Sequence, residues 1–492
     1  MMQGHSVSFR YGSVVALAFT GVLSAHAQPR TTSIPSCLDY VEGMKQKIEA
    51  NYAGFRLEIV GERRAEYEGF VESLREHARS IATDQCYETL HGFTTWFNDP
   101  HLFVFQSSRI DSAEGQGRRD RITRRQLSEV TVRGELQRRM GRLDPIEGIW
   151  TDGRLRVAVV PAGMDRFEAI VLTADSASWS PGDVRGTFVR ENEGYRVTLV
   201  GRNYAERVLE GSIHKRVLLR ISPEMWAREY PVVPEDAGLV DISDPRRPTL
   251  LEREGTVIVS IPSHSPAYKQ VLDSMIARNA DVFRDSPRLI VDLRGNEGGS
   301  SLMSDGLLPY ILSDHELPER FPERGGAVML SSPDQMAYAR RAFGPDTTRF
   351  VRTLLERLEA EPGGFAPLME PGQERPVTRP DSLIHGPSYV GVMIDEGTVS
   401  ASEVLVLKAL RSTRAVVFGL PTAGALDYQS TYIVPLVPGV GRWFLGYPTI
   451  TRDTLLPLDG MRGNGIAPQV RLDWNLIPDP INHVDRALRG HP

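Results

Sequence analysis

The sequence predicts an α/β fold with a parallel-type sheet and flanking helices, plus an N-terminal helical cap and a small antiparallel β module. Helical spacing of apolar residues over 37–98 predicts the cap, and apolar/polar alternation between turn signals over 148–221 predicts the β module. Four short apolar runs separated by helical stretches predict the strands of the sheet. These runs are residues 256–261, 289–293, 389–394 and 415–418.

The 492-residue chain is long enough to form two or three domains with substantial cores. We expect a signal peptide at 1–27, an N-terminal helical region at 28–105, a polar connecting segment at 106–147, the β module at 148–230 and the α/β domain at 250–480. The β module is predicted to be a barrel or a sandwich, and the stretch rich in Pro and Asp at 231–248 is predicted to be the linker that follows it.

The N-terminus predicts export. Residues 1–10 carry one arginine and no acid, residues 11–23 are mostly apolar, and residues 25–27 (AHA) form an A-x-A cleavage site. The apolar stretch is too short to span a bilayer, although an uncleaved anchor is the alternative. We therefore expect cleavage near Ala27 and a periplasmic or extracellular mature chain with no stable membrane span.

Composition narrows the class of partner. The formal net charge is −6, and the only dense basic run lies at 118–125, in a stretch that reads as a solvated loop or surface helix. This gives no support to nucleic-acid binding. Cys37 and Cys86 are the only cysteines, and in an exported protein such a pair predicts one disulfide, with two free thiols as the alternative.

Small-residue loops follow three of the predicted strands. They hold Gly295 to Gly299, Ser400, and Thr422 to Gly424. Because ligands bind at the carboxyl ends of parallel strands, we expect these loops to meet at one edge of the sheet.

Ser400 has two possible roles. With Glu403 three residues later, it matches a helix capping box. On a strand-to-helix turn it is also placed as a nucleophile, next to backbone N–H groups of Gly298, Gly299 and Ala401 that would form an oxyanion hole. The glycine loop has neither the P-loop nor the dinucleotide-binding pattern, and a plain tight turn is its alternative.

Three motifs carry a family resemblance. Residues 292–299 (DLRGNEGG), 400–403 (SASE) and 419–424 (GLPTAG) occur in the order and spacing of the tail-specific, or C-terminal-processing, serine protease family. The resemblance covers roughly residues 250–470, with a fainter match at 98–101. It implies a ClpP/crotonase-like core, a catalytic role for residues 250–480, an extended peptide or protein as substrate, and Ser400 as nucleophile. It implies no cofactor.

The resemblance also bears on the general base. The tail-specific branch uses a lysine where this chain has Ala425, although Gln429 fills that branch's glutamine position. The branch that contains the tricorn protease core and interphotoreceptor retinoid-binding protein uses an upstream histidine, which His101 resembles. A histidine is a suitable base for a serine hydroxyl. We therefore expect His101 to be the base, with His264 as the alternative.

The orienting acid is less well marked. Residues 463–468 (GNGIAP) resemble the family's closing segment, but Arg462 stands where tricorn-type members carry a glutamate. Asp459 is the nearest substitute and Asp427 is another. Thr422, Gly424 and Gln429 are candidates for the substrate site.

The expected function is an exported serine-type peptidase. A catalytically inactive protein of the same fold that holds a peptide or an apolar small ligand is the alternative, because the family's lysine and glutamate are both missing. No metal-ligand spacing is present in the sequence. The oligomeric state is left open.

Overall fold

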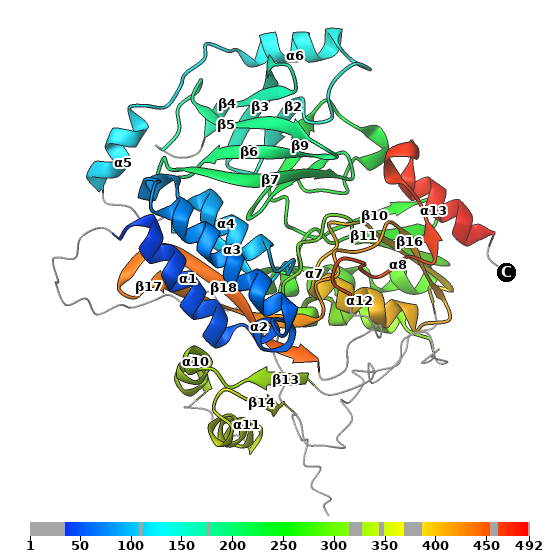
Figure 1. Cartoon of the computed structure of the whole chain (residues 1–492). Helices are drawn as coiled ribbons and strands as arrows, with labels where there is room; N and C mark the ends of the chain where they lie inside the picture. The colour runs from blue at the N-terminus through cyan, green and yellow to red at the C-terminus, as the bar shows by residue number, and fades with distance from the viewer. Residues whose placement is uncertain are drawn as a thin grey trace, which may run out of the picture.

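The computed structural model describes residues 35–107, 112–174, 178–313, 327–343, 349–368, 386–452 and 461–490. Figure 1 shows a β-barrel above a sheet that is flanked by helices, with the N-terminal helices beside the sheet. The predicted signal peptide and Asp459 lie outside the described residues. Among the described residues, no helix combines the length and the apolar character that crossing a bilayer requires.

The central sheet has six strands and is mixed rather than wholly parallel. Its order is β10 (Thr249–Arg253), β11 (Thr256–Ser260), β12 (Arg288–Asp292), β15 (Tyr389–Ile394), β16 (Ala415–Gly419) and β19 (Val470–Arg471). Only β10 runs antiparallel to its neighbour, and the other pairings are parallel. The carboxyl ends of β12, β15 and β16 therefore share one edge.

Helices cover both faces of this sheet, so its strands are apolar on both sides. One face packs on α7 (Lys269–Arg278), α8 (Ala280–Asp285) and α12 (Ala401–Leu410), and the other packs on α13 (Pro480–Arg489). Val257 and Val259 belong to the first core, whereas Ile258 between them belongs to the second. Residues 301–311 form a 3₁₀ helix, η4 (Ser301–Leu307), followed by the short α9 (Leu308–Ile311).

The β module is a closed eight-stranded antiparallel barrel rather than a sandwich. Trp150, Phe188 and Trp226 are fully buried in its core, and α6 (Glu129–Arg138) packs on its outer surface through Val132 and Leu136. A second connecting helix, α5 (Ser112–Arg119), precedes α6. The strands are β2 (Gly148–Thr151), β3 (Leu155–Gly163), β4 (Arg166–Ala174), β5 (Val184–Glu191), β6 (Gly194–Val200), β7 (Glu206–His214), β8 (Leu218–Ile221) and β9 (Glu224–Tyr230).

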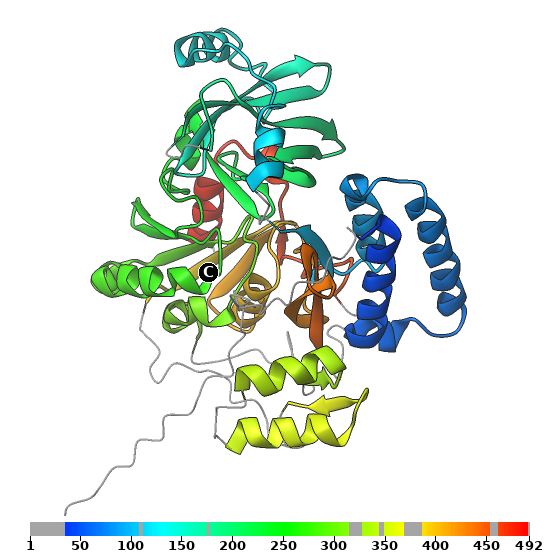
Figure 2. The same cartoon turned by 90° about the vertical axis from the view of Figure 1, so that its left-hand side faces the viewer.

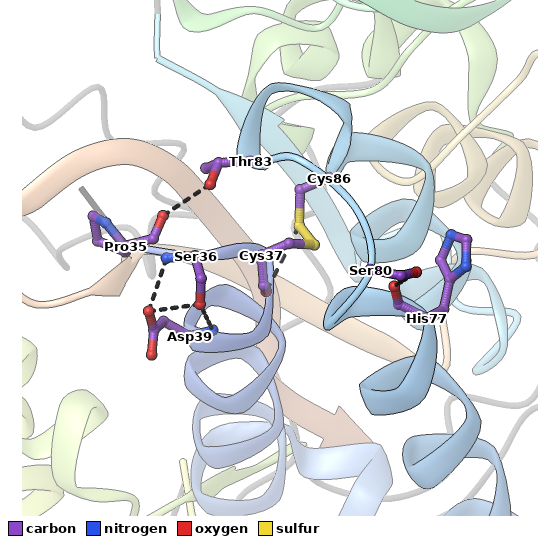
Figure 3. Close-up of a disulfide and its surroundings, with 8 residues drawn as sticks. All are labelled: Pro35, Ser36, Cys37, Asp39, His77, Ser80, Thr83 and Cys86. Atoms are coloured by element: carbon purple, nitrogen blue, oxygen red, sulfur yellow. Dashed lines mark hydrogen bonds between the residues drawn. A yellow bond between two sulfur atoms is a disulfide. The ribbon is translucent and has the colours of Figure 1, made fainter. Parts of the chain in front are cut away.

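The N-terminal region is a helical layer on a long hairpin. The helices are α1 (Cys37–Asn51), α2 (Ala53–Glu58), α3 (Glu62–Ala78) and α4 (Tyr87–Thr95). They share one apolar core with β17 (Tyr428–Val437) and β18 (Val440–Arg452), which form one antiparallel hairpin. Cys37 and Cys86 form a disulfide that ties the start of α1 to the start of α4 (Figure 3).

The hairpin also belongs to a second sheet. Strand β18 pairs with β1 (Phe103–Gln106) and with β13 (Ala327–Leu330), which in turn pairs with β14 (Phe365–Pro367). Helices α10 (Pro333–Phe343) and α11 (Arg349–Ala360) cover this end and lie below the rest of the molecule in Figure 2. The sequence did not predict α10, β13 or β14.

Candidate active site

Ser400 lies at the N-terminus of α12, directly after the loop that follows β15. Its backbone has φ +59° and ψ −112°, a combination that a residue with a side chain rarely adopts. Such a turn lifts the side chain out of the helix end, as in other strand-to-helix nucleophile turns. The turn therefore exposes the Ser400 hydroxyl in a way that an ordinary N-cap does not.

Glu403 holds this turn in place from inside the protein. Its carboxylate accepts hydrogen bonds from the backbone N–H of Ser400 at 2.6 Å, of Gly424 at 2.8 Å and of Ala425 at 3.0 Å, and from the Thr422 hydroxyl at 2.7 Å. Burial raises the pKa of Glu403, and these four donors oppose that rise. Glu403 thus caps the Ser400 amide, the predicted capping box between these two residues is present, and the Ser400 hydroxyl has a further partner.

That partner is His101. Its Nε2 lies 3.0 Å from Ser400 Oγ, although the two residues are 299 positions apart. The His101 backbone N–H donates to Asp99 Oδ1 at 2.9 Å, and the Tyr52 hydroxyl donates to Asp99 Oδ2 at 2.8 Å. Burial raises the pKa of Asp99, and the neighbouring His101 and these hydrogen bonds lower it. Asp99 therefore fixes the position of the histidine through its main chain.

Within the described residues, no carboxylate is hydrogen-bonded to the His101 ring. The buried Nδ1 atom has no partner there. Asp427 instead accepts the backbone N–H groups of Met461 and Arg462. Arg462, at the position of the family's glutamate, pairs with Glu58 of the N-terminal helical layer. Asp427 is thus used in holding the loop after β18, and the prediction for Asp459 falls outside the described residues.

The glycine loop lies against the nucleophile turn. A Cβ on Gly298 would lie 2.7 Å from Val399 O and 2.9 Å from Ser400 Cβ, so only glycine permits this approach. The Gly298 N–H donates to Asn296 Oδ1 at 2.8 Å, which corrects our expectation that it would face an oxyanion. Among the described residues, no protein acceptor bonds the N–H of Gly299 or of Ala401. These two N–H groups remain the candidates for the predicted oxyanion hole.

The predicted substrate-site residues have other contacts. The Thr422 hydroxyl donates to Glu403 and accepts the Ile466 N–H at 2.8 Å, and the Gly424 N–H also donates to Glu403. The side chain of Gln429 donates to Leu426 O at 3.0 Å. Thr422 and Gly424 thus support the nucleophile turn through Glu403, which local sequence patterns did not indicate.

The alternative base, His264, is placed in the core. Its side chain is fully buried, and Nδ1 lies 2.9 Å from Asn296 Nδ2. Burial lowers the pKa of His264 to about 4, against the opposing effect of the Asn296 hydrogen bond. His264 is therefore neutral at pH 7, and its neighbour is the glycine loop rather than Ser400.

Together these groups provide the parts of an acyl-transfer site. A serine hydroxyl is hydrogen-bonded to an imidazole, and the Ala401 N–H lies at the start of a helix whose dipole favours negative charge. In the described parts of the chain, no three His, Cys, Asp or Glu side chains gather in a way that would hold a metal ion.

The comparisons with known proteins find one family model that matches the region of this site. Residues 255–471 match the sequence model of peptidase family S41, and no curated protein matches the chain. Among the solved structures that match is mature CPAF complexed with lactacystin, at 14% identity and a TM-score of 0.45, over 92% of this chain and 98% of that one. The photosystem II D1 C-terminal processing protease is 14% identical at a TM-score of 0.33, over 93% and 98%.

The tricorn protease is 12% identical at a TM-score of 0.34, over 92% of this chain and 36% of that chain. All three TM-scores lie below 0.5, so the likeness to a peptidase family rests on the match of residues 255–471 alone.

Proposed function

We propose that this chain, whose residues 255–471 match peptidase family S41, is a serine-type peptidase that cleaves peptide bonds with Ser400 as nucleophile and His101 as general base. The observation that carries this proposal is the 3.0 Å contact between His101 Nε2 and Ser400 Oγ. A ClpP/crotonase-like core, which the sequence resemblance implies, belongs to the same proposal.

The first step forms an acyl-enzyme. Ser400 Oγ attacks the scissile carbonyl carbon while His101 Nε2 takes the hydroxyl proton, and the carbonyl oxygen becomes an oxyanion next to the Gly299 and Ala401 N–H groups. His101 then returns the proton to the leaving amine as the C–N bond breaks. In the second step a water molecule, deprotonated by His101, hydrolyses the ester and restores Ser400.

We assign Asp99 the role of positioning residue for His101. Its carboxylate holds the histidine main chain and is itself held by Tyr52. A serine–lysine dyad is not part of the proposal, because Ala425 occupies the lysine position and its N–H is bonded to Glu403.

The remaining parts of the proposal concern substrate and location. We propose an extended peptide segment as substrate, with the N-terminal helical layer and the barrel shaping access to Ser400. We also propose export with cleavage near Ala27 and function outside the cytoplasm. The A-x-A triplet and the Cys37–Cys86 disulfide support this location, since disulfides persist in oxidising compartments.

Turnover of a mixed peptide pool tests the proposed function. The mature wild-type protein should release new N-termini, Ser400→Ala should release none, and His101→Ala should be slower by about 10²–10⁴-fold. His77→Ala, on the exposed surface of α3, is the matched control and should behave like the wild type (Figure 3). Turnover by Ser400→Ala at the wild-type rate would refute the nucleophile, and full activity of His101→Ala would refute the base.

A further inference from the structure

The barrel reaches into the loops of the active site. Strand β7 lies on the side of the barrel that faces the central sheet (Figure 1), and Lys215, in the turn between β7 and β8, contacts the ends of β11 and β12 in that sheet. This turn carries His214 and Lys215, which are 3% and 5% exposed. Two buried, polar residues on a hairpin turn are unusual, because such turns normally face water.

His214 is bonded on both sides of its ring. Nδ1 lies 2.6 Å from Asp395 Oδ2, and Nε2 lies 2.8 Å from Ser212 Oγ. The ring is also enclosed by glycines of the core: a Cβ on Gly295 would lie 2.7 Å from the His214 ring, and one on Gly397 would lie 2.4 Å from it. The His214 side chain is therefore packed between the glycine loop after β12 and the loop after β15.

Asp395 joins those two loops to each other. Its Oδ1 accepts the N–H of Gly295 at 2.8 Å and the N–H of Gly397 at 3.0 Å. Gly295 begins the glycine loop that ends at Gly299, and Gly397 lies three residues before Ser400. Burial raises the pKa of Asp395, but His214 and the Gly295 N–H lower it more, so the carboxylate is held ionised.

Two further contacts from the same hairpin reach the same loops. Lys215 Nζ donates to Ser260 Oγ at 2.8 Å and lies 3.5 Å from Asp292 Oδ2, at the end of β12. Arg220 of β8 donates to Gly397 O at 2.7 Å. One barrel hairpin therefore contacts the strand end before the oxyanion loop and the loop before the nucleophile.

We propose that His214 is a positioning residue for peptide hydrolysis. Through Asp395 it fixes the position of the glycine loop, which carries the proposed oxyanion donor, relative to the turn that carries Ser400. This inference rests on the proposed function of Ser400. It assigns the barrel a part in catalysis, although His214 acts through Asp395 rather than on the substrate. The alternative is that the hairpin only attaches the barrel to the core.

Two isosteric variants separate these possibilities. In His214→Asn the amide nitrogen can replace Nδ1 and keep the bond to Asp395, whereas in His214→Gln the nitrogen replaces Nε2 and that bond is lost. We expect kcat to fall by about 10–10²-fold in His214→Gln with KM changed less than about twofold, and to stay within about threefold of the wild type in His214→Asn. Met164→Ala, at the exposed tip of the β3–β4 hairpin, is the control and should change neither parameter.

Hydrogen exchange of residues 293–300 and 395–402 provides a readout that does not need activity. We expect faster exchange in both segments in His214→Gln and wild-type exchange in His214→Asn. Wild-type kcat and exchange in His214→Gln would overturn the proposal, as would equal losses in both variants. If wild-type protein hydrolyses no peptide but His214→Gln still loosens both segments selectively, the proposed peptidase function fails while the His214–Asp395 link to these loops stands.

Discussion

Replacement of Glu403 by glutamine tests how the nucleophile turn is held. Glutamine keeps the size of the side chain but turns one carboxylate oxygen into an NH₂ group. In either orientation the NH₂ group faces donors: the Ser400 and Ala425 N–H groups on one side, or the Gly424 N–H and Thr422 hydroxyl on the other. At least one buried main-chain N–H then loses its acceptor.

The size of the effect follows from these contacts. A hydrogen bond to a charged group contributes about 1.5–3 kcal/mol, so losing two costs about 3–6 kcal/mol. Burial already raises the pKa of the Glu403 carboxyl, so removing its negative charge offsets part of this loss. We expect the free energy of unfolding to fall by about 2–4 kcal/mol, and kcat to fall by about tenfold or more because the Ser400 main chain is no longer fixed.

Urea unfolding and initial rates on one peptide substrate measure both effects. Asp39→Asn is the matched control, because Asp39 makes the same main-chain capping contact with Ser36 at the exposed start of α1 (Figure 3). That change should cost no more than about 1 kcal/mol and leave kcat unchanged. A Glu403→Gln variant that loses less than about 1 kcal/mol and keeps wild-type kcat would contradict the reasoning.

Three further predictions concern stability. Removing the disulfide with Cys37→Ser and Cys86→Ser should lower the free energy of unfolding in urea by about 4 kcal/mol, because the disulfide joins residues 49 positions apart. Reductant should destabilise the wild type but leave this variant unchanged. His264 has a folded-state pKa of about 4 against an ordinary 6.5, so the unfolded chain takes up the proton first as pH falls. The stabilisation of the folded state by neutral His264 is therefore complete above pH 6.5, and about 3 kcal/mol of it is lost as the pH falls to about 4. His264→Gln should remove this part of the pH dependence of the free energy of unfolding. Tyr52→Phe should cost about 1–3 kcal/mol and lower kcat, because buried Asp99 loses a donor; unchanged unfolding and rates would refute this.

Apolar periodicity was sufficient for four strands of the sheet, β11, β12, β15 and β16, because these strands are short and bounded by turn residues. It did not predict the edge strands β10 and β19, and it left a barrel and a sandwich open for the β module. It did not predict β17 and β18 as one long hairpin, since this pair is covered by the N-terminal helices from far away in the sequence. It also missed that 301–307 winds as a 3₁₀ helix, because tertiary contacts with α7 and α12 decide that geometry.

The candidate site also has parts that the sequence predicted and parts that it did not. Motif spacing brought Ser400 and the glycine loop together, and the resemblance pointed to His101, which lies 3.0 Å from Ser400; the catalytic roles of both stay predictions. No local pattern marks the contact between His214 and Asp395, because the two residues are 181 positions apart, one in the barrel and one in the loop after β15. The hydrogen bond that occupies the Gly298 N–H depends on a side-chain orientation that the sequence does not record.

Site-resolved labelling with a fluorophosphonate tests the central claim most directly. Intact mass followed by peptide mapping should find one modification on the mature wild-type protein, located at Ser400, with none on Ser400→Ala and markedly slower labelling of His101→Ala. A wild-type protein that stays unlabelled, or that is labelled at another serine, would contradict the assignment of Ser400 as the nucleophile.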